Sequence, residues 1–173
     1  NLYGIIVPSR IGSLVIEKNT INANKHYGIW LLDGANHIRI LDNQITENGD
    51  HGICVEGAAT LSNTISGNSI SRNLGKGIAL ISGGNANLPA PVITKSTWSA
   101  ENIWGTAEAP DGSIVEIFAD PDDEGLQRIG RGTVYRNTFQ AAGYFKDDGS
   151  LKLHATVTDP QGNTSEFGPA FTK

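Results

Sequence analysis

The chain has 173 residues and a formal net charge of −5 at pH 7, with 38% hydrophobic and 18% charged residues. A mildly acidic chain of this kind offers no basic face to phosphate groups, so nucleic acid is excluded as an expected partner. Its apolar runs are all shorter than the roughly 20 residues of a membrane-spanning helix, so no membrane span is predicted.

Two short phrases recur along residues 1–84 with a nearly constant period. A phrase that begins with Gly-Ile starts at Gly4, Gly28, Gly52 and Gly77, in steps of 24, 24 and 25 residues. A second phrase, Asn-x-Ile, keeps the same spacing at Asn19, Asn43 and Asn68, and another asparagine follows five residues after each. Periods of this length are typical of proteins whose structural repeats stack on one another.

Within each repeat the apolar residues alternate with polar ones, which is the two-residue period of half-buried strands. Three short strands fit each turn: one at residues 14–16, 38–40 and 63–65, one around Ile21, Ile45 and Ile70, and one at the Gly-Ile phrase. Strands this short are stabilised when they pair with their copies in coils about 4.8 Å above and below. The pattern therefore predicts a parallel β-helix of about three coils over residues 1–84. Its asparagines should form two ladders and adopt the left-handed backbone of the corners.

A stretch rich in Gly, Asn, Ala and Pro then interrupts the repeat, which predicts a linker over residues 85–91. Longer strands follow between turn signals, at residues 92–98, 102–108, 113–119, 127–135, 137–145, 151–158 and 165–171. About seven strands in this length predict an immunoglobulin-like β-sandwich over residues 92–173. It would lack the usual disulfide, because Cys54 is the only cysteine.

These phrases carry a family resemblance. The first half resembles the right-handed parallel β-helix of pectate-lyase-like proteins, and segments 103–106, 115–119 and 154–167 resemble the immunoglobulin-like module that closes many secreted bacterial β-helix proteins. The fold class implied is all-β: a short right-handed parallel β-helix followed by an immunoglobulin-like β-sandwich. The resemblance also implies an extracellular or cell-surface protein that meets polysaccharide.

Alignment of the coils brings a group of polar residues together around the third strand: His26, Tyr27, Asp50, His51 and Lys76. In a polysaccharide lyase, Tyr27 or His51 could act as acid or base beside a uronate carboxylate that Lys76 neutralises. The alternative is that these are solvated corner residues. No column carries two or three carboxylates in succession, which counts against a complete active site.

Ligand binding makes smaller demands than catalysis, and Trp30 is the leading candidate for it. Trp30 takes an outward strand position, where it could stack on a sugar ring or contact another protein, with Asp33 and Glu56 on the exit side of the strand. The other tryptophans, Trp98 and Trp104, are expected to pack in the core or against the other domain.

The acidic loop after residue 119 could hold a calcium ion through Asp120, Asp122 and Asp123. Its spacing differs from that of an EF-hand loop, and a solvated hairpin tip is the alternative. No other cofactor is predicted.

The leading hypothesis for function is a non-catalytic extracellular or cell-surface module for polysaccharide binding, adhesion or assembly. The alternative is a fragment of a polysaccharide-active enzyme, a lyase, epimerase or hydrolase, that acts on the outer face of the β-helix. The first coil shows no polar cap, so its open edge is expected to pair with further β-helix coils, a partner chain or an identical subunit.

Overall fold

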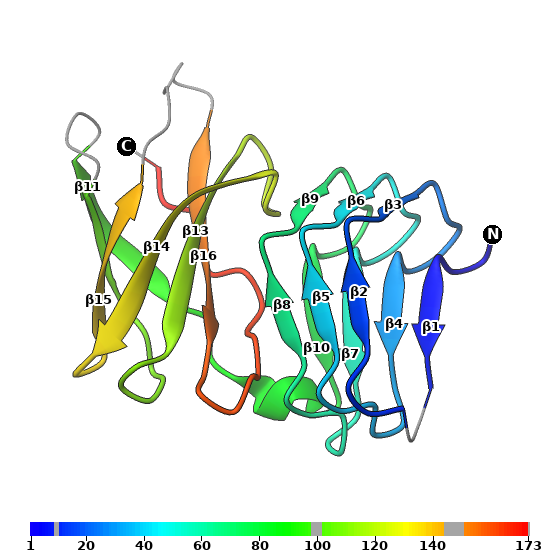
Figure 1. Cartoon of the computed structure of the whole chain (residues 1–173). Coiled ribbons are helices and arrows are strands. Elements are labelled where there is room, and N and C mark those ends of the chain that lie inside the picture. Colours follow the sequence, from blue (N-terminus) through cyan, green and yellow to red (C-terminus); the bar gives the residue numbers. More distant parts are fainter. Residues whose placement is uncertain (9–10, 98–101, 144–150, 173) are drawn as a thin grey trace.

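The computed structural model describes residues 1–8, 11–97, 102–143 and 151–172. A β-solenoid and a curved antiparallel sheet lie side by side along the molecule, and the N-terminus lies at the far end of the solenoid (Figure 1). The helical content in the described residues is one short 3₁₀ turn, η1 (Gly84–Asn87). No helix within these ranges is long and apolar enough to cross a lipid bilayer.

The solenoid has three parallel sheets, each made of one strand per coil, so the predicted parallel β-helix is confirmed. The first sheet has the order β1 (Ile5–Val7), β4 (Ile29–Leu31), β7 (Ile53–Glu56), β10 (Ile78–Ile81). The second has the order β2 (Val15–Glu17), β5 (Arg39–Leu41), β8 (Thr64–Ser66). The third has the order β3 (Thr20–Asn22), β6 (Gln44–Thr46), β9 (Ser69–Ser71). The strands of the second sheet begin one residue later than expected.

Isoleucine stacks on isoleucine inside the coils. Residues in register across neighbouring coils are Ile16, Ile40 and Ile65, then Ile21, Ile45 and Ile70, then Ile29, Ile53 and Ile78. All of these side chains are buried in one hydrophobic cluster. Burial of each such side chain stabilises the fold by about 1.5–3 kcal/mol, so the repeat period is also the period of the core.

The two predicted asparagine ladders are present. The N–H of Asn19 donates to Oδ1 of Asn43 at 2.9 Å, and the N–H of Asn43 donates to Oδ1 of Asn68 at 2.9 Å. The Nδ2 of Asn43 also donates to the carbonyl of Ile16 in the preceding coil, at 2.8 Å. The same geometry recurs one corner later in Asn24, Asn48 and Asn73. The asparagines of the middle coil, Asn43 and Asn48, therefore link that coil to both of its neighbours.

The left-handed corner residues are not the asparagines, so that part of the expectation is wrong. The residue before each asparagine takes the positive φ: 55° at Lys18, 52° at Asp42 and 71° at Gly67. The turn thus falls one position earlier. The asparagine is needed at the next position for its amide, which pairs with the neighbouring coil.

Glycine begins the Gly-Ile phrase because neighbouring coils approach closely there. A Cβ added at Gly28 would lie 2.6 Å from the carbonyl oxygen of Gly52 and 2.9 Å from Nδ2 of Asn48. Both distances are shorter than a real Cβ contact, so any side chain would push the coils apart.

The second unit is one six-stranded antiparallel sheet. Its strands lie in the order β11 (Val92–Thr97), β12 (Asn102–Thr106), β15 (Thr138–Gly143), β14 (Gln127–Tyr135), β13 (Ile114–Asp120), β16 (Lys152–Thr158). The sheet curls into a half-barrel around the second hydrophobic cluster (Figure 1). Because the pairing runs unbroken from β11 to β16 instead of dividing into two packed sheets, the predicted immunoglobulin-like sandwich is not confirmed.

The expected strand at residues 165–171 is replaced by an irregular segment that lies between the half-barrel and the solenoid. Phe171 forms an isolated bridge with Leu153, while Phe167 packs against the solenoid core and against the ring of Phe118.

The half-barrel caps the last coil of the solenoid by supplying the partners that another coil would supply. Glu124 accepts hydrogen bonds from the N–H and Nδ2 of Asn73, at 3.2 and 2.9 Å, and so takes the place of the next asparagine in the ladder. Gly125 and Ile70 exchange two main-chain hydrogen bonds of 3.0 Å. The Thr164 hydroxyl oxygen accepts the N–H of Ile65 at 2.9 Å.

Two further contacts complete this junction. Glu116 is 3% exposed and accepts hydrogen bonds from the Ser66 hydroxyl, the Gly67 N–H and the Arg128 guanidinium. Within the stretch predicted as a linker, Asn85 is fully buried: its Oδ1 accepts the N–H of Asn63, and its Nδ2 donates to the carbonyls of Asn63 and Thr164.

Replacing Asn48 with alanine is expected to lower the free energy of unfolding by about 3 kcal/mol, because several buried polar groups lose their partners. Asn48 is fully buried and bonds to both Asn24 and Asn73. Urea unfolding measures the loss. The matched control is Asn19→Ala on the exposed end of the other ladder, which should cost less than about 1 kcal/mol. Equal losses in the two variants would contradict the role given to the ladder.

The contribution of Glu124 to stability should fall as the pH rises. Burial raises the pKa of Glu124 above its usual value, although the hydrogen bonds from Asn73 oppose the shift. An acid with a raised folded-state pKa stabilises fully below its unfolded pKa, and that contribution is lost as the pH rises through the folded pKa. In urea unfolding between about pH 4 and pH 7, the stability advantage of the wild type over Glu124→Ala should shrink. An advantage that grows with pH would contradict this account.

Candidate functional site

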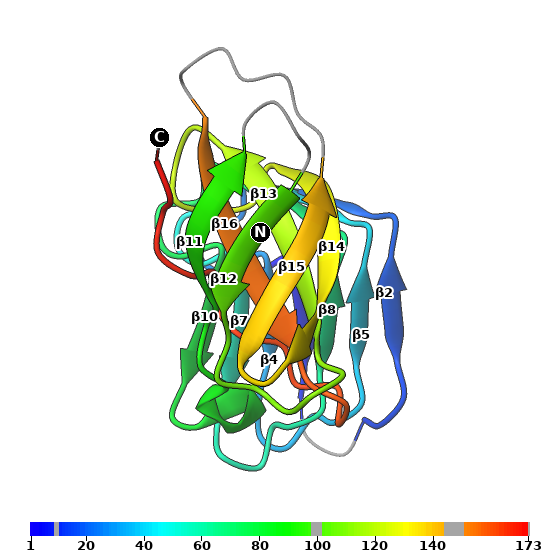
Figure 2. The same ribbon diagram turned by 90° about the vertical axis from the view of Figure 1, so that its left-hand side faces the viewer.

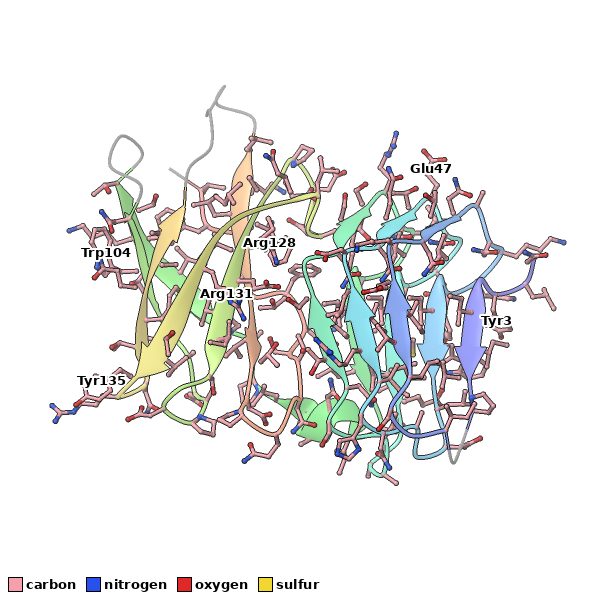
Figure 3. All side chains as sticks on the ribbon, in the orientation of Figure 1. Tyr3, Glu47, Trp104, Arg128, Arg131 and Tyr135 are labelled. Carbon is pink, nitrogen blue, oxygen red and sulfur yellow. The ribbon has the colours of Figure 1, made fainter. Side chains whose placement is uncertain are left out.

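An aromatic cluster covers the outer face of the first solenoid sheet, on the coils farthest from the half-barrel. Its members are Tyr3, His26, Tyr27, Trp30 and His51. Trp30 points outward from β4, since its neighbours Ile29 and Leu31 are fully buried in the coil. Figure 3 shows Tyr3 beside β1, at the N-terminal end of the solenoid.

The rings of the cluster contact one another from coil to coil. Tyr27 and His51 are stacked with their ring centroids 5.5 Å apart and their planes at 6°. The Tyr3 ring lies 5.1 Å from Trp30, 5.8 Å from Tyr27 and 5.3 Å from His26. This spacing follows from the coil repeat, because equivalent side chains lie about 4.8 Å apart along the stack.

Tyr3 is the cluster residue that the sequence interpretation missed. It precedes Gly4 as Tyr27 precedes Gly28, so the repeat alignment contained the signal. His26 and Asp50, which were expected in one polar group, form no ion pair with each other in the described part of the chain, and His26 stacks on Tyr3.

His51 is held by its neighbours in a defined tautomer. Its Nδ1 accepts the main-chain N–H of Lys76 at 2.9 Å, and Oδ1 of Asp50 lies 3.5 Å from the same nitrogen. A ring nitrogen that accepts a hydrogen bond carries no proton, so neutral His51 has its proton on Nε2. The basic lone pair of the neutral ring is therefore already engaged by the next coil.

The ammonium group of Lys76 is paired with the carboxylate of Glu166, with Nζ 2.6 Å from Oε2. The other oxygen of Glu166 accepts the N–H of Leu80 at 2.9 Å. Glu166 comes from the irregular segment after β16, which sequence interpretation placed in a sandwich strand. Lys76 and Glu166 also line a cleft of about 390 Å³ that reaches the buried His154.

The Tyr27 hydroxyl, which belongs to the cluster, and the neighbouring Cys54 thiol both have raised pKa values. Burial raises the pKa of the Tyr27 hydroxyl, and the nearby Cys54, Asp50 and Glu56 add to the shift. Burial, with help from Glu56 and Asp50, raises the pKa of the Cys54 thiol to about 12. At neutral pH both groups keep their protons, so Tyr27 presents a neutral phenol and Cys54 packs as a small apolar residue.

The three predicted ligand-binding residues divide into a pair and an outlier. The indole Nε1–H of Trp30 donates to Oε2 of Glu56 at 2.9 Å, which fixes this carboxylate beside the cluster. Asp33 is exposed in the turn after β4, with a left-handed φ of 52°. The sequence placed Glu56 only on the exit side of the strand, and the structure brings its carboxylate to the Trp30 indole.

The predicted calcium residues do not converge. Asp120 is fully buried, and its two oxygens accept the N–H groups of Asp122 and Leu126 at 2.5 and 2.6 Å. Asp123 is directed to Nζ of Lys152 at 3.0 Å. In the described part of the chain, no three His, Cys, Asp or Glu residues are grouped so that they could hold a metal ion. The loop is closed by its own backbone.

Trp104 falls in a different place from the one expected. Trp104 lies on the outer face of the half-barrel, partly exposed, with Nζ of Lys95 5.1 Å from its ring centroid. Its strand neighbours Ile103 and Gly105 face inward. The expectation that Trp104 packs in the core or against the other domain is therefore wrong, and Trp98 lies outside the described residues.

Comparison with known proteins agrees with the solenoid architecture. The family model described as right-handed beta helix region matches residues 2–96, more than half of the 173 residues. No match was found among curated proteins. The parallel sheets, the stacked isoleucines and the asparagine ladders all lie within the matched range. The chain therefore belongs to the right-handed β-helix family.

Proposed function

We propose that this chain is a non-catalytic binding module that holds polysaccharide on the aromatic cluster. The observation that carries the proposal is the contact of Tyr3, Tyr27 and Trp30 with one another on an outward sheet face. Aromatic rings in contact across successive coils form an apolar strip with polar edges, and the C–H faces of sugar rings stack on such surfaces.

Polar groups at the edges of the strip would orient the bound sugar through hydrogen bonds. Trp30 holds Glu56 in place, so the carboxylate can accept hydrogen bonds from sugar hydroxyls with little further loss of conformational entropy. The raised pKa of Tyr27 keeps its hydroxyl protonated, so it can donate as well as accept. The strip runs along the solenoid axis, which suits an extended chain better than a compact ligand.

Binding is favoured over turnover by the engagement of the candidate catalytic groups. A lyase needs a free base and a cation for the substrate carboxylate. In this site the Nδ1 of His51 accepts a hydrogen bond from Lys76, and Nζ of Lys76 is paired with Glu166. We propose a cell-surface or extracellular setting because the repeat resembles that of secreted β-helix proteins.

Replacing Tyr27 with alanine should weaken polysaccharide binding roughly tenfold, because a stacking surface at the centre of the strip is lost. Affinity electrophoresis against plant, algal and bacterial polysaccharides identifies the ligand, and calorimetry measures the affinity. The matched control is Tyr27→Phe, which keeps the ring and should bind within a few-fold of the wild type.

Reducing or unsaturated sugar ends are assayed in the same samples. If the wild type forms such ends and the His51→Ala variant does not, the non-catalytic proposal is overturned. Equal affinity in Tyr27→Ala and the wild type, with both folded by circular dichroism, would overturn the assignment of the site.

The N-terminal edge of the solenoid favours a second proposed partner, a further parallel β-coil. In later coils the asparagine Nδ2 groups donate to isoleucine carbonyls of the coil before, as Asn43 does to Ile16 and Asn68 does to Ile40. Within the described residues, Asn19 and Asn24 have no such coil on their outer side. The side-chain amides of these two asparagines can therefore form the same ladder bonds with another coil.

An added coil tests this directly. A copy of residues 25–48 placed ahead of Asn1 keeps the 24-residue register, and it should raise the melting temperature by several degrees if the edge accepts it. The control places the same copy ahead of a chain that carries Asn19→Ala and Asn24→Ala, and there the copy should give a clearly smaller rise. An equal rise in melting temperature in the two backgrounds would contradict the proposal.

A further inference from the structure

A second groove lies over β11, β12, β14 and β15 of the half-barrel. Figure 2 shows these strands on the side turned away from the solenoid. Its volume is about 810 Å³. Trp104 stands on β12, and Arg131 and Tyr135 stand on β14 (Figure 3). The two strands are separated by β15, so β12 and β14 lie roughly 10 Å apart across the sheet. Arg131 lies one row to one side of the Trp104 row, and Tyr135 lies one row to the other side.

The strand register arranges the lining into rows. Trp104 pairs with Lys95 on one side and with Gln140 on the other, and Gln140 pairs in turn with Thr133. The next row contains Thr106, Thr138 and Tyr135. The groove thus presents two aromatic side chains above a floor of hydroxyl and amide groups, which can donate to and accept from a densely hydroxylated ligand.

The charge of this groove is opposite to that of the chain as a whole. Arg131 lines the groove, and it forms no ion pair with any other described residue. Lys95 lies over the Trp104 ring, and the guanidinium carbon of Arg136 lies 5.1 Å from the Tyr135 ring centroid. None of the described residues that line the groove is acidic, although the chain carries a net charge of −5.

We propose that this groove is a binding site for an anionic polysaccharide chain. Trp104 and Tyr135 flank the sugar rings, Arg131 pairs with a carboxylate or sulfate group, and the hydroxyl and amide floor bonds to sugar hydroxyls. The site is separate from the aromatic cluster of the solenoid, and it requires none of that cluster's residues.

A sugar chain fits these observations better than a nucleic acid. Arg131 is the one basic side chain among the described residues that line the groove, whereas a groove that follows a nucleic-acid backbone carries several positive charges. The threonine and amide floor also has no counterpart in a basic groove that follows phosphates.

The experiment uses the full chain carrying Tyr27→Ala, which disables the solenoid cluster. Affinity for polygalacturonate and for dextran sulfate is measured by calorimetry, beside their uncharged counterparts, methyl-esterified polygalacturonate and dextran. Binding of a charged polymer that exceeds its neutral counterpart at least tenfold, and that weakens with added salt, supports the site. The charged polymer that binds identifies the anion.

Variants then locate the binding. Arg131→Gln and Trp104→Ala should each weaken it roughly tenfold, because each removes a charge-assisted or a stacking contact. Arg39→Gln, an exposed arginine on β5, is the matched control and should leave it unchanged. Trp104→Phe keeps a ring and should retain most of the affinity, which separates ring loss from misfolding.

The proposal would be overturned by binding of neither charged polymer, by equal binding of charged and neutral polymers, or by unchanged affinity in Arg131→Gln and Trp104→Ala. Displacement of the bound polysaccharide from the groove by a single-stranded oligonucleotide of higher affinity would also overturn it in favour of a nucleic-acid ligand.

Discussion

The hydrogen bond from the main chain of one coil to the asparagine side chain of the next is the interaction on which this structure depends. A ladder of such bonds must end somewhere, and its last asparagine would otherwise leave buried donors unpaired. In this chain the ladder of Asn24, Asn48 and Asn73 ends on the carboxylate of Glu124 from the half-barrel. The second unit is thus the terminal cap of the solenoid, and it replaces the coil that would come next.

The same stacking generates the candidate site. Coils held in register place equivalent side chains above one another, so a tyrosine before the repeat glycine in two coils becomes two rings in contact. Trp30 joins them from the adjacent strand position and holds Glu56. The cap acts on this face as well, because its Glu166 pairs with Lys76 at the end of the column. The cluster and the groove around Trp104 lie at opposite ends of the molecule, so each can be tested separately.

The solenoid could be predicted from the sequence because each coil interacts mainly with copies of itself, and periodicity reports that directly. Tyr3 was missed, although its place before Gly4 marked it. The half-barrel was harder, since alternation identifies inward residues such as Val115 and Phe139 but does not say which strands pair. Glu166 was predicted in a strand and Thr164 just ahead of it, yet their solenoid partners lie 86 and 99 residues away, where no local pattern could indicate them.

Amide hydrogen exchange along the intact chain tests the capping role most directly. If the half-barrel completes the ladders, protection should increase from the first coil to the last, so that Ile65, Ile70 and Asn73 exchange far more slowly than the equivalent residues of the first coil. A last coil that exchanges as fast as the first, while the strands of the half-barrel stay protected, would show that the two units are merely neighbours and would contradict the account.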